Sequence, residues 1–434
     1  MNSVAKYFRF GELGTNFRTE LIAGLTTFVS MDYILFVNPT VLGAAGMVKG
    51  AVFTATGVAA AIATIFMGLV AHYPIAIAPG LGVNAFFAYS VVIGMKVPWQ
   101  TAMAGVLIAA IIFLLLTFFK IRETIINMIP QDLKVAIAAG IGLFIAFIGL
   151  ANAGLIVANE STMVSLGHLT SGTSLLAIFG IIVTFILIAT RIPAAIFIGM
   201  VLTAIVGIIS GLIDLPTHIV SAAPSLAPTF GESISHITDI NTFQLWTVVL
   251  TFLIVTFFDT AGTMIGLATQ AGFMKDGKMP RAGRALMADA VGMTAGAILG
   301  TSPTSAYVES SSGMAVGGRS GLTSITTGIL FIFALMFSPL LTVVTSQVTA
   351  PALVVGVLMA ENLRNIDWDD FAIAAPSFLI VIGMPLTYSI SDGIALGFIL
   401  YPIMMIATKR AGKVHPLMYA LAFIFMLFLF IVAH

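Results

Sequence analysis

Carboxylates inside the long apolar stretches of this sequence are few: Asp32, Asp259, Asp289 and Glu309. A charged side chain at membrane depth is costly, and by default it indicates a binding site or an ion pathway. An ionised carboxylate has only acceptor oxygens, so it can bind the N–H groups of a planar ligand, and in its neutral form it can carry a proton. These residues therefore predict the binding of a small polar solute, coupled to proton movement.

Glu309 lies in a stretch that is a poor continuous helix, GTSPTSAYVESSSG at 300–313. Pro303 has no N–H to donate, and the hydroxyl side chains beside it compete for backbone groups. A similar stretch, PIAIAPGLGVNAFF, runs through Pro79 to Asn84. Two interrupted segments in corresponding positions of two halves are typical of the binding site of a secondary transporter. The alternative is a pair of ordinary proline kinks in a channel or a structural membrane protein.

Asp259 lies in another polar motif, FFDTAGTMIG at 257–266. Thr263 follows four residues later and therefore shares a helix face with Asp259. The small residues of the motif allow a helix or a ligand to approach closely. We expect Asp259 to serve a transport pathway, and the alternative is simple pairing with a neighbouring helix.

The other polar and aromatic candidates each have a structural alternative. Asn84 could bind a ligand edge of mixed polarity or cap a broken helix. Phe86 could stack on a ring or only pack in the bundle. Asp32 could face the same cavity or bond within its own bundle, and Asp289, close to Arg284, is expected to be structural.

The composition places the chain in a membrane. Of 434 residues, 59% are hydrophobic and 8% are charged, a balance that excludes a soluble domain. A net charge of zero gives no indication of nucleic-acid binding. The absence of cysteine excludes disulfides and a thiolate metal site. We expect the first apolar segment to be retained as a span, since it is too long for a signal peptide.

Hydrophobic segments of membrane-spanning length, about 20 residues, set the predicted topology. They lie near 21–43, 51–71, 75–95, 99–119, 130–152, 173–190, 192–213, 243–268, 283–300, 302–318, 321–345, 348–363, 371–389, 391–408 and 415–433. With residues 1–20 in the cytoplasm and the segments alternating, only Lys49 and Lys96 of the 18 Lys and Arg residues fall outside, as the positive-inside rule requires. Loops 153–172 and 214–242 are then external, and loops 273–283 and 409–414 are cytoplasmic.

The two halves of the chain are predicted to form an inverted repeat. Segments 1 to 7 end near residue 213 and segments 8 to 14 near residue 408, and an odd number of spans reverses the second copy. The helical parts that follow Pro79 and Pro303 then start near the midplane, with their positive dipole ends toward a common cavity. Whether 415–433 forms an additional span is left open.

The motifs together resemble one transporter family. They read TTFVSMDYILFVNP in segment 1, APGLGVNAFF in segment 3, FFDTAGTMIGLATQAG in segment 8 and TSPTSAYVESSSGMAVGGRSGL in segment 10. They are similar to the AzgA-like purine permeases, the guanine/hypoxanthine and adenine branch of the nucleobase–cation symporter 2 family, over nearly the whole chain. The resemblance implies an all-α polytopic membrane protein with about 14 transmembrane segments as a seven-plus-seven inverted repeat. Broken segments 3 and 10 would carry short antiparallel strands at the midplane.

The resemblance also implies two domains and a set of substrate-binding residues. Residues 21–119 and 243–345 would form a core domain, and residues 130–213 and 348–434 a gate domain. Substrate binding would involve Asp259, Glu309 and Asn84. The further substrate-binding candidates in these motifs are Phe86, Thr263, Thr304, Ser305 and Tyr307. Asp259 and Glu309 would also carry the coupling proton.

Two positions refine the comparison with the family. Thr263 stands where the xanthine/uracil branch commonly has histidine, which favours the purine branch. The family commonly has alanine at the position of Asp32, so the resemblance implies no role for Asp32.

The expected function is import of purine bases by proton symport across the cell membrane, with no enzymatic activity, metal or cofactor. The expected partners are the base, a proton and the lipid bilayer, with a homodimer as one candidate assembly and no nucleic acid. One alternative is a xanthine/uracil-type permease. Another is an anion transporter of the sulfate-permease architecture, although two carboxylates in the site would repel an anion. An intramembrane enzyme is disfavoured because the sequence has neither HExxH nor GxSxG.

Overall fold

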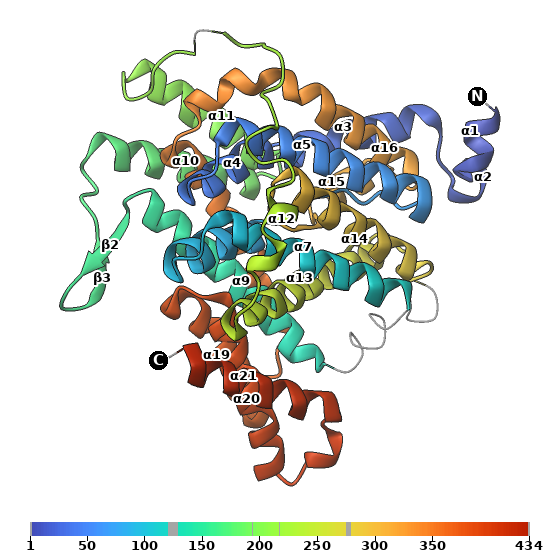
Figure 1. Ribbon diagram of the computed structural model, residues 1–434. Coiled ribbons are helices and arrows are strands. Elements are labelled where there is room, and N and C mark those ends of the chain that lie inside the picture. Colours follow the sequence, from blue (N-terminus) through green and yellow to red (C-terminus); the bar gives the residue numbers. More distant parts are fainter. Residues whose placement is uncertain (1, 120–128, 193, 217, 275–278, 433–434) are drawn as a thin grey trace.

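The computed structural model describes residues 2–119, 129–192, 194–216, 218–274 and 279–432 (Figure 1). The described chain is a bundle of helices with two short two-stranded sheets. Residues 275–278, in the charged loop predicted to be cytoplasmic, and residues 120–128 lie outside the described residues.

The first half of the chain contains one of the two predicted interrupted segments, in which β1 precedes α6. Its elements are α1 (Asn2–Tyr7), α2 (Phe10–Leu13), α3 (Phe17–Met31), α4 (Ile34–Ala44), α5 (Lys49–Phe66) with a π-helical turn (Met67–Ala71), β1 (Ile77–Pro79), α6 (Leu81–Ala85) with a π-helix (Phe86–Gly94), α7 (Trp99–Phe118), α9 (Gln131–Asn152), β2 (Ile156–Asn159), β3 (Met163–Leu166), α10 (Gly172–Ala189) and α11 (Ala195–Ile209).

The second half repeats the interruption before α15. Its elements are α12 (Glu232–Ser235), a 3-10 turn (Ile237–Asp239), α13 (Phe243–Gln270), α14 (Ala282–Leu299), β4 (Thr304–Ala306), α15 (Ser310–Ala315), α16 (Gly321–Ala334) with a 3-10 helix (Leu335–Val343), α17 (Ser346–Thr349), a 3-10 turn (Ala350–Leu353), α18 (Val354–Ala360), a 3-10 turn (Glu361–Asn365), α19 (Phe371–Thr387), α20 (Ile390–Ala407), a 3-10 turn (Ala411–Lys413) and α21 (Pro416–Val432).

Within the described residues, six helices are long and apolar enough to cross a membrane. They are Phe17–Ala44, Lys49–Ala71, Trp99–Phe118, Gln131–Asn152, Gly172–Ala189 and Gly321–Val343. Shorter apolar helices include Ala195–Ile209, Phe371–Thr387, Asp392–Ala407 and Pro416–Leu427. The segment predicted at 348–363 differs from a regular span, because it is a series of short helices with Pro351 in the turn between α17 and α18.

The two interrupted segments meet through their strands. β1 and β4 pair antiparallel, with Ala78 opposite Ser305 at the centre. The Gly80 N–H donates to Pro303 O at 2.9 Å, and the Tyr307 N–H donates to Ala76 O at 3.0 Å, so the pairing continues beyond both ends. The prediction that two broken segments carry short strands is therefore confirmed, and the strand pair satisfies backbone groups that a broken helix would otherwise leave unpaired.

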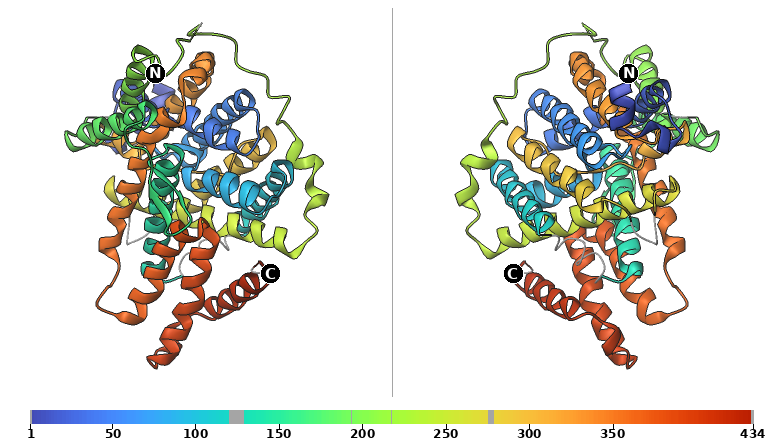
Figure 2. Two further views of the ribbon diagram at one scale, coloured as in Figure 1. Left: turned by 90° about the vertical axis from the view of Figure 1, so that its left-hand side faces the viewer. Right: turned by 90° about the vertical axis from the view of Figure 1, so that its right-hand side faces the viewer.

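Helices of both halves pack around this strand pair. α5 packs on α4, α14 and α16, and α3 packs on α15 and α16. A second set of contacts joins α9 to α18 and α19, α19 to α20, and α10 to α11. Figure 2 shows α19, α20 and α21 extending at one end of the molecule. These two sets of contacts follow the predicted core and gate ranges, and the division into two domains stays a prediction.

The predicted external loops have more structure than expected. β2 and β3 form a hairpin whose turn is held by Asn159 Oδ1, which accepts the N–H groups of Ser161 and Thr162 at 2.9 and 3.0 Å. The chain from 218 to 231 crosses the bundle as a long connection (Figure 2). It is pinned there, since Pro224 O accepts the Thr54 hydroxyl at 2.8 Å.

Candidate substrate-binding site

Asp259 and Ser305 converge beside the end of β1. The Ser305 hydroxyl, on the central residue of β4, donates to the carboxylate of Asp259, on α13. Both side chains lie against Gly80, the residue after β1: a Cβ there would be 2.6 Å from Ser305 Oγ and 3.2 Å from Asp259 Oδ2. Gly80 thus leaves room for this pair, and the site lies where the two halves of the chain meet.

Glu309 lies three residues after β4, at the residue before α15. The Tyr33 hydroxyl donates to Glu309 Oε1 at 2.6 Å. Tyr33 is fully buried between α3 and α4, whereas Glu309 is partly exposed. A phenol bonded to a carboxylate at this distance is a charge-assisted hydrogen bond. The carboxylate therefore has a fixed protein partner and remains open on one side.

The backbone between β4 and α15 is held by side chains. The Tyr307 hydroxyl donates to Pro79 O at 2.5 Å, across the strand pair. The Ser310 hydroxyl accepts the Ala76 N–H at 3.0 Å. These bonds fix the path of the chain from β4 into Glu309, so this carboxylate is carried by a well-held backbone.

Asn84, on α6, belongs to a buried polar cluster that also includes Asn38 on α4 and Thr56 on α5. Its Nδ2 donates to Asn38 Oδ1 at 3.0 Å, and Asn38 Nδ2 donates to Thr56 and Thr301 at 2.8 Å each. Ser302 Oγ also donates to Asn38 Oδ1, at 3.1 Å. Asn84 Oδ1 has no hydrogen-bond partner among the described residues. The structure thus shows a protein partner for Asn84, and its contact with substrate stays a prediction.

The remaining predicted site residues differ in their surroundings. Phe86 is fully buried, and its ring packs edge-on against Phe252 with centroids 5.1 Å apart. The Thr304 hydroxyl donates to Asp289 O at 3.3 Å, toward α14. Thr263 is partly exposed on α13, one turn beyond Asp259. The roles of these three residues in binding stay predictions.

Asp32 lies at the break between α3 and α4. Its carboxyl accepts the backbone N–H of Tyr33, and Asp32 Oδ1 has no partner among the described residues. A short acidic side chain that bonds the next N–H is a usual device at such a break. The side chain thus serves the local backbone beside the phenol that holds Glu309.

Sequence reasoning missed three residues that build the site: Tyr33, Gly80 and Asn38. Each lies in a stretch that was recognised as polar or interrupted, SMDYILFVNP or APGLGVNAFF. For Tyr33 and Asn38 the available signal was a hydroxyl or an amide inside an apolar span, which in lipid must find a partner. The identity of the partner, 276 residues away for Tyr33 and Glu309, is not contained in any local pattern.

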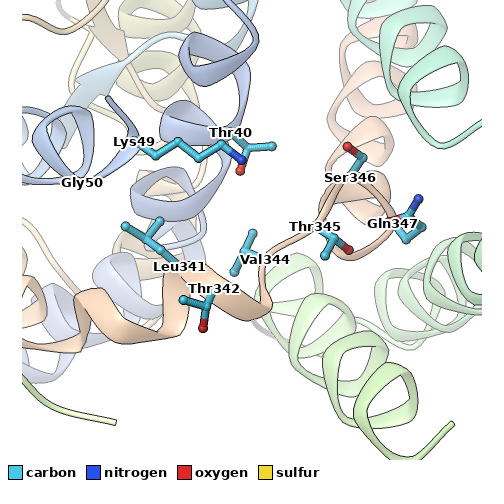
Figure 3. Close-up of a pocket in the computed structure, with 9 residues that line it drawn as sticks. All are labelled: Thr40, Lys49, Gly50, Leu341, Thr342, Val344, Thr345, Ser346 and Gln347. Atoms are coloured by element: carbon cyan, nitrogen blue, oxygen red, sulfur yellow. The ribbon is translucent and has the colours of Figure 1, made fainter. Parts of the chain in front are cut away.

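A separate cleft of about 530 Å³ opens between the start of α5 and the chain from the 3-10 helix to α17. Figure 3 shows Lys49 and Thr40 on one wall, and Thr345, Ser346 and Gln347 opposite. None of the predicted site residues lines it. In the predicted topology Lys49 is external, so the cleft would open to the outside.

The arrangement can accept N–H donors on two carboxylates, Asp259 and Glu309. Within the described residues, no group of three or more His, Asp or Glu side chains could hold a metal ion. Interrupted segments from two halves, meeting beside intramembrane carboxylates, define a membrane transporter with an inverted repeat.

Comparison with known proteins assigns the chain to a family. The model Xan_ur_permease, described as "Permease family", matches residues 18–431, so the chain belongs to this permease family. It is 56% identical over 432 residues to the guanine/hypoxanthine permease PbuG of Bacillus subtilis, covering 97% of this chain and 98% of that protein. It is 44% identical to the adenine permease AdeP of Escherichia coli, covering 99% and 96%. The resemblance drawn from the motifs is confirmed.

Solved structures show the same fold. The transmembrane domain of the cyanobacterial bicarbonate transporter BicA matches with a TM-score of 0.59 and 14% identity, covering 90% of this chain and 96% of that one. SLC26A9 matches with a TM-score of 0.62 and 10% identity, covering 93% and 66%. The predicted seven-plus-seven fold class is thereby confirmed, while identities this low carry no substrate over to this chain.

Proposed function

We propose that the protein imports purine nucleobases, guanine and hypoxanthine or adenine, by proton symport. One observation supports this above all: two carboxylates, Asp259 and Glu309, lie near the strand pair in a chain 56% identical to a guanine/hypoxanthine permease. Guanine and hypoxanthine are planar and neutral, and both present an N1–H that a carboxylate can accept. Their O6 and N7 atoms accept hydrogen bonds, and backbone N–H groups can supply the donors.

Proton coupling follows from the same two residues. A neutral base gains nothing from the membrane potential, so concentrative uptake needs a coupled ion. A tenfold proton gradient contributes about 1.4 kcal/mol of free energy to concentrative uptake for each proton transported. Desolvation disfavours two ionised carboxylates in one site, so one of the pair can take up a proton as the base binds.

Alternating access would come from movement of residues 21–119 and 243–345 against residues 130–213 and 348–434. The strand pair and both carboxylates belong to the first set. Supporting this division, the strong helix contacts of α9 are made with α18 and α19 of the second set. A rigid core carrying the site past a gate is how inverted-repeat transporters expose one site to both sides.

The test is uptake of radiolabelled bases into proteoliposomes or intact cells. We expect guanine, hypoxanthine or adenine to be taken up, more strongly as the external pH is lowered from about 8 to about 6 because the inward proton gradient grows. A protonophore should abolish concentrative uptake, and replacing sodium by potassium should not. Uptake that needs sodium and survives a protonophore would refute proton coupling and leave the substrate assignment standing.

Two variants test whether Glu309 and Asp259 belong to the binding site. Glu309→Gln places an NH₂ group toward ligand donors and should weaken base binding by about 2–4 kcal/mol, which is about 30-fold or more. Asp259→Asn should impair transport by a comparable factor. Glu12→Gln, at a side chain that is 71% exposed on α2, is the matched control. Normal binding and transport by both site variants, at wild-type abundance in the membrane, would refute the assignment.

A further inference from the structure

Tyr33 occupies an unusual place for a tyrosine in an apolar span. It lies between α3 and α4, after Asp32, and its side chain has no exposed surface. A buried hydroxyl in a membrane protein needs a partner, and the partner here is the Glu309 carboxylate at 2.6 Å. A phenol has one proton to donate, so this bond uses it completely.

The bond fixes one half of the carboxylate. With Oε1 taken by Tyr33, a ligand N–H must use the remaining lone pairs of the Glu309 carboxylate. The phenol also limits the rotamers that Glu309 can adopt, because leaving the bond would bury an unpaired hydroxyl. Tyr33 therefore selects an orientation of Glu309 before any ligand arrives.

The approach of Tyr33 to Glu309 is built into the packing of α3 on α15. Ser30 Oγ and Ser312 Oγ lie 2.9 Å apart. A Cβ at Gly313 would be 2.1 Å from Thr27 Oγ1 and 2.6 Å from Ala23 O, so the two helices touch nearly backbone to backbone. Residues 23, 27 and 30 lie on one face of α3, and Tyr33 continues from that face at the break.

The far end of the same contact is anchored by Glu20. Its carboxylate accepts the N–H groups of Arg319 and Ser320, at 2.9 and 3.2 Å, and the Thr323 hydroxyl at 2.6 Å. Glu20 thus ties α3 to the chain between α15 and α16. Because both ends of the contact are fixed, α3 holds α15 in place, and with it the carboxylate of Glu309, the residue before α15.

We propose that Tyr33 is a positioning residue for substrate binding: its hydroxyl holds the Glu309 carboxylate in the orientation that accepts the N–H donors of the base. The proposal rests on the proposed function, in which Glu309 binds the base. Tyr33 acts through Glu309, so the two residues should behave as one unit when both are changed.

The experiment is a double-variant cycle with Tyr33→Phe and Glu309→Gln in purified full-length protein. Tyr33→Phe keeps the ring and removes only the hydroxyl. Alone, it should weaken guanine binding about 10- to 100-fold, the range for a hydrogen bond to a charged group, and should raise KM much more than it lowers the maximal rate. When Glu309→Gln is already present, adding Tyr33→Phe should lower the affinity for guanine only a little further.

A second cycle, on the melting temperature of the protein without ligand, serves where Glu309→Gln binds too weakly to measure. Tyr33→Phe and Glu309→Gln should each lower the melting temperature, and the double variant should lower it by less than their sum. The control is Tyr89→Phe, which removes a hydroxyl that accepts from Asn152 Nδ2 at 2.6 Å and should be additive with Glu309→Gln.

Additive effects of the Tyr33 and Glu309 variants on melting, or unchanged guanine affinity in Tyr33→Phe, would overturn the proposal. The two hypotheses fail in different ways. If the wild-type protein binds and transports no purine, the proposed function is wrong. The melting cycle still decides by itself whether Tyr33 holds Glu309.

Discussion

Gly80→Ala tests a crowded point of the candidate site. Gly80 has φ −77° and ψ 133°, a backbone conformation that alanine adopts without strain. Only the added methyl group matters, and it would lie 2.6 Å from Ser305 Oγ and 3.2 Å from Asp259 Oδ2. The first distance is too short for any real contact, so Ser305 must rotate away and lose its hydrogen bond to Asp259.

The magnitude follows from the cost of overpacking, about 1–3 kcal/mol. If this cost falls on the bound state, the affinity for guanine drops by about 5- to 150-fold, at 1.4 kcal/mol for each factor of ten. The assay is equilibrium binding of radiolabelled guanine to purified protein, with the melting temperature measured in parallel. Gly11→Ala is the matched control, because a Cβ there meets nothing within 4 Å.

A second-site change sharpens this test. In Gly80→Ala/Ser305→Ala the clashing oxygen is gone, and the Ser305 Cβ would lie at an ordinary distance of 3.4 Å from the new methyl group. The double variant should therefore bind guanine more tightly than Gly80→Ala alone. Wild-type affinity in Gly80→Ala would show that the pair formed by Ser305 and Asp259 is not part of the binding site.

Three further predictions concern other parts of the molecule. Glu20→Gln should destabilise the protein by about 2–3 kcal/mol, measured by denaturation in detergent, because a fully buried carboxylate that accepts four hydrogen bonds of 2.6 to 3.2 Å loses acceptor oxygen. The Arg410 guanidinium, hydrogen-bonded to Asp370, lowers the pKa of that carboxyl, so their stabilising pair should be intact above about pH 4 and lost at lower pH. Melting temperatures of Asp370→Asn should accordingly fall less than those of wild type on acidification, and an unchanged pH dependence would contradict this. In this cysteine-free chain, Gly412→Cys should react with an impermeant thiol reagent only from the cytoplasmic side and Ser161→Cys only from outside; the reverse labelling would refute the topology.

The fold could be predicted largely because its signals are local. Apolar segment lengths, basic residues and prolines gave the broken segments 3 and 10, and β1 and β4 are found there. The hairpin at β2 and β3 was missed because residues 153–172 were assigned only as a polar loop. The series of short helices from 346 to 365 was missed because hydropathy does not reveal where a helix is interrupted.

The candidate site could be predicted only in part. Asp259 and Glu309 stand out in sequence because carboxylates are rare in lipid. Their partners do not stand out, because Tyr33 and Ser305 are ordinary residue types whose importance depends on contacts between distant segments. Asn84 was recognised as polar, but its bond to Asn38 could be read only from the packing of α4 on α6.

The strand pair also shows how one symmetric backbone supports asymmetric chemistry. Because Ala78 is opposite Ser305 at its centre, the local twofold axis of the antiparallel pair relates each residue of the first segment to the one 227 positions later. The two bonds beyond the strands, Gly80 N to Pro303 O and Tyr307 N to Ala76 O, obey this relation.

The axis therefore relates Gly80 to Tyr307 and Gly82 to Glu309. Where the second half places a tyrosine that closes the strand pair by donating to Pro79 O, the first half places a glycine against which Ser305 and Asp259 pack. Both carboxylates come from the second half, and the first half contributes the phenol of Tyr33 and the glycine against which Ser305 and Asp259 lie. A site of this kind needs both halves, since the donor to Glu309 and the glycine beside Asp259 come from the first half and both carboxylates from the second.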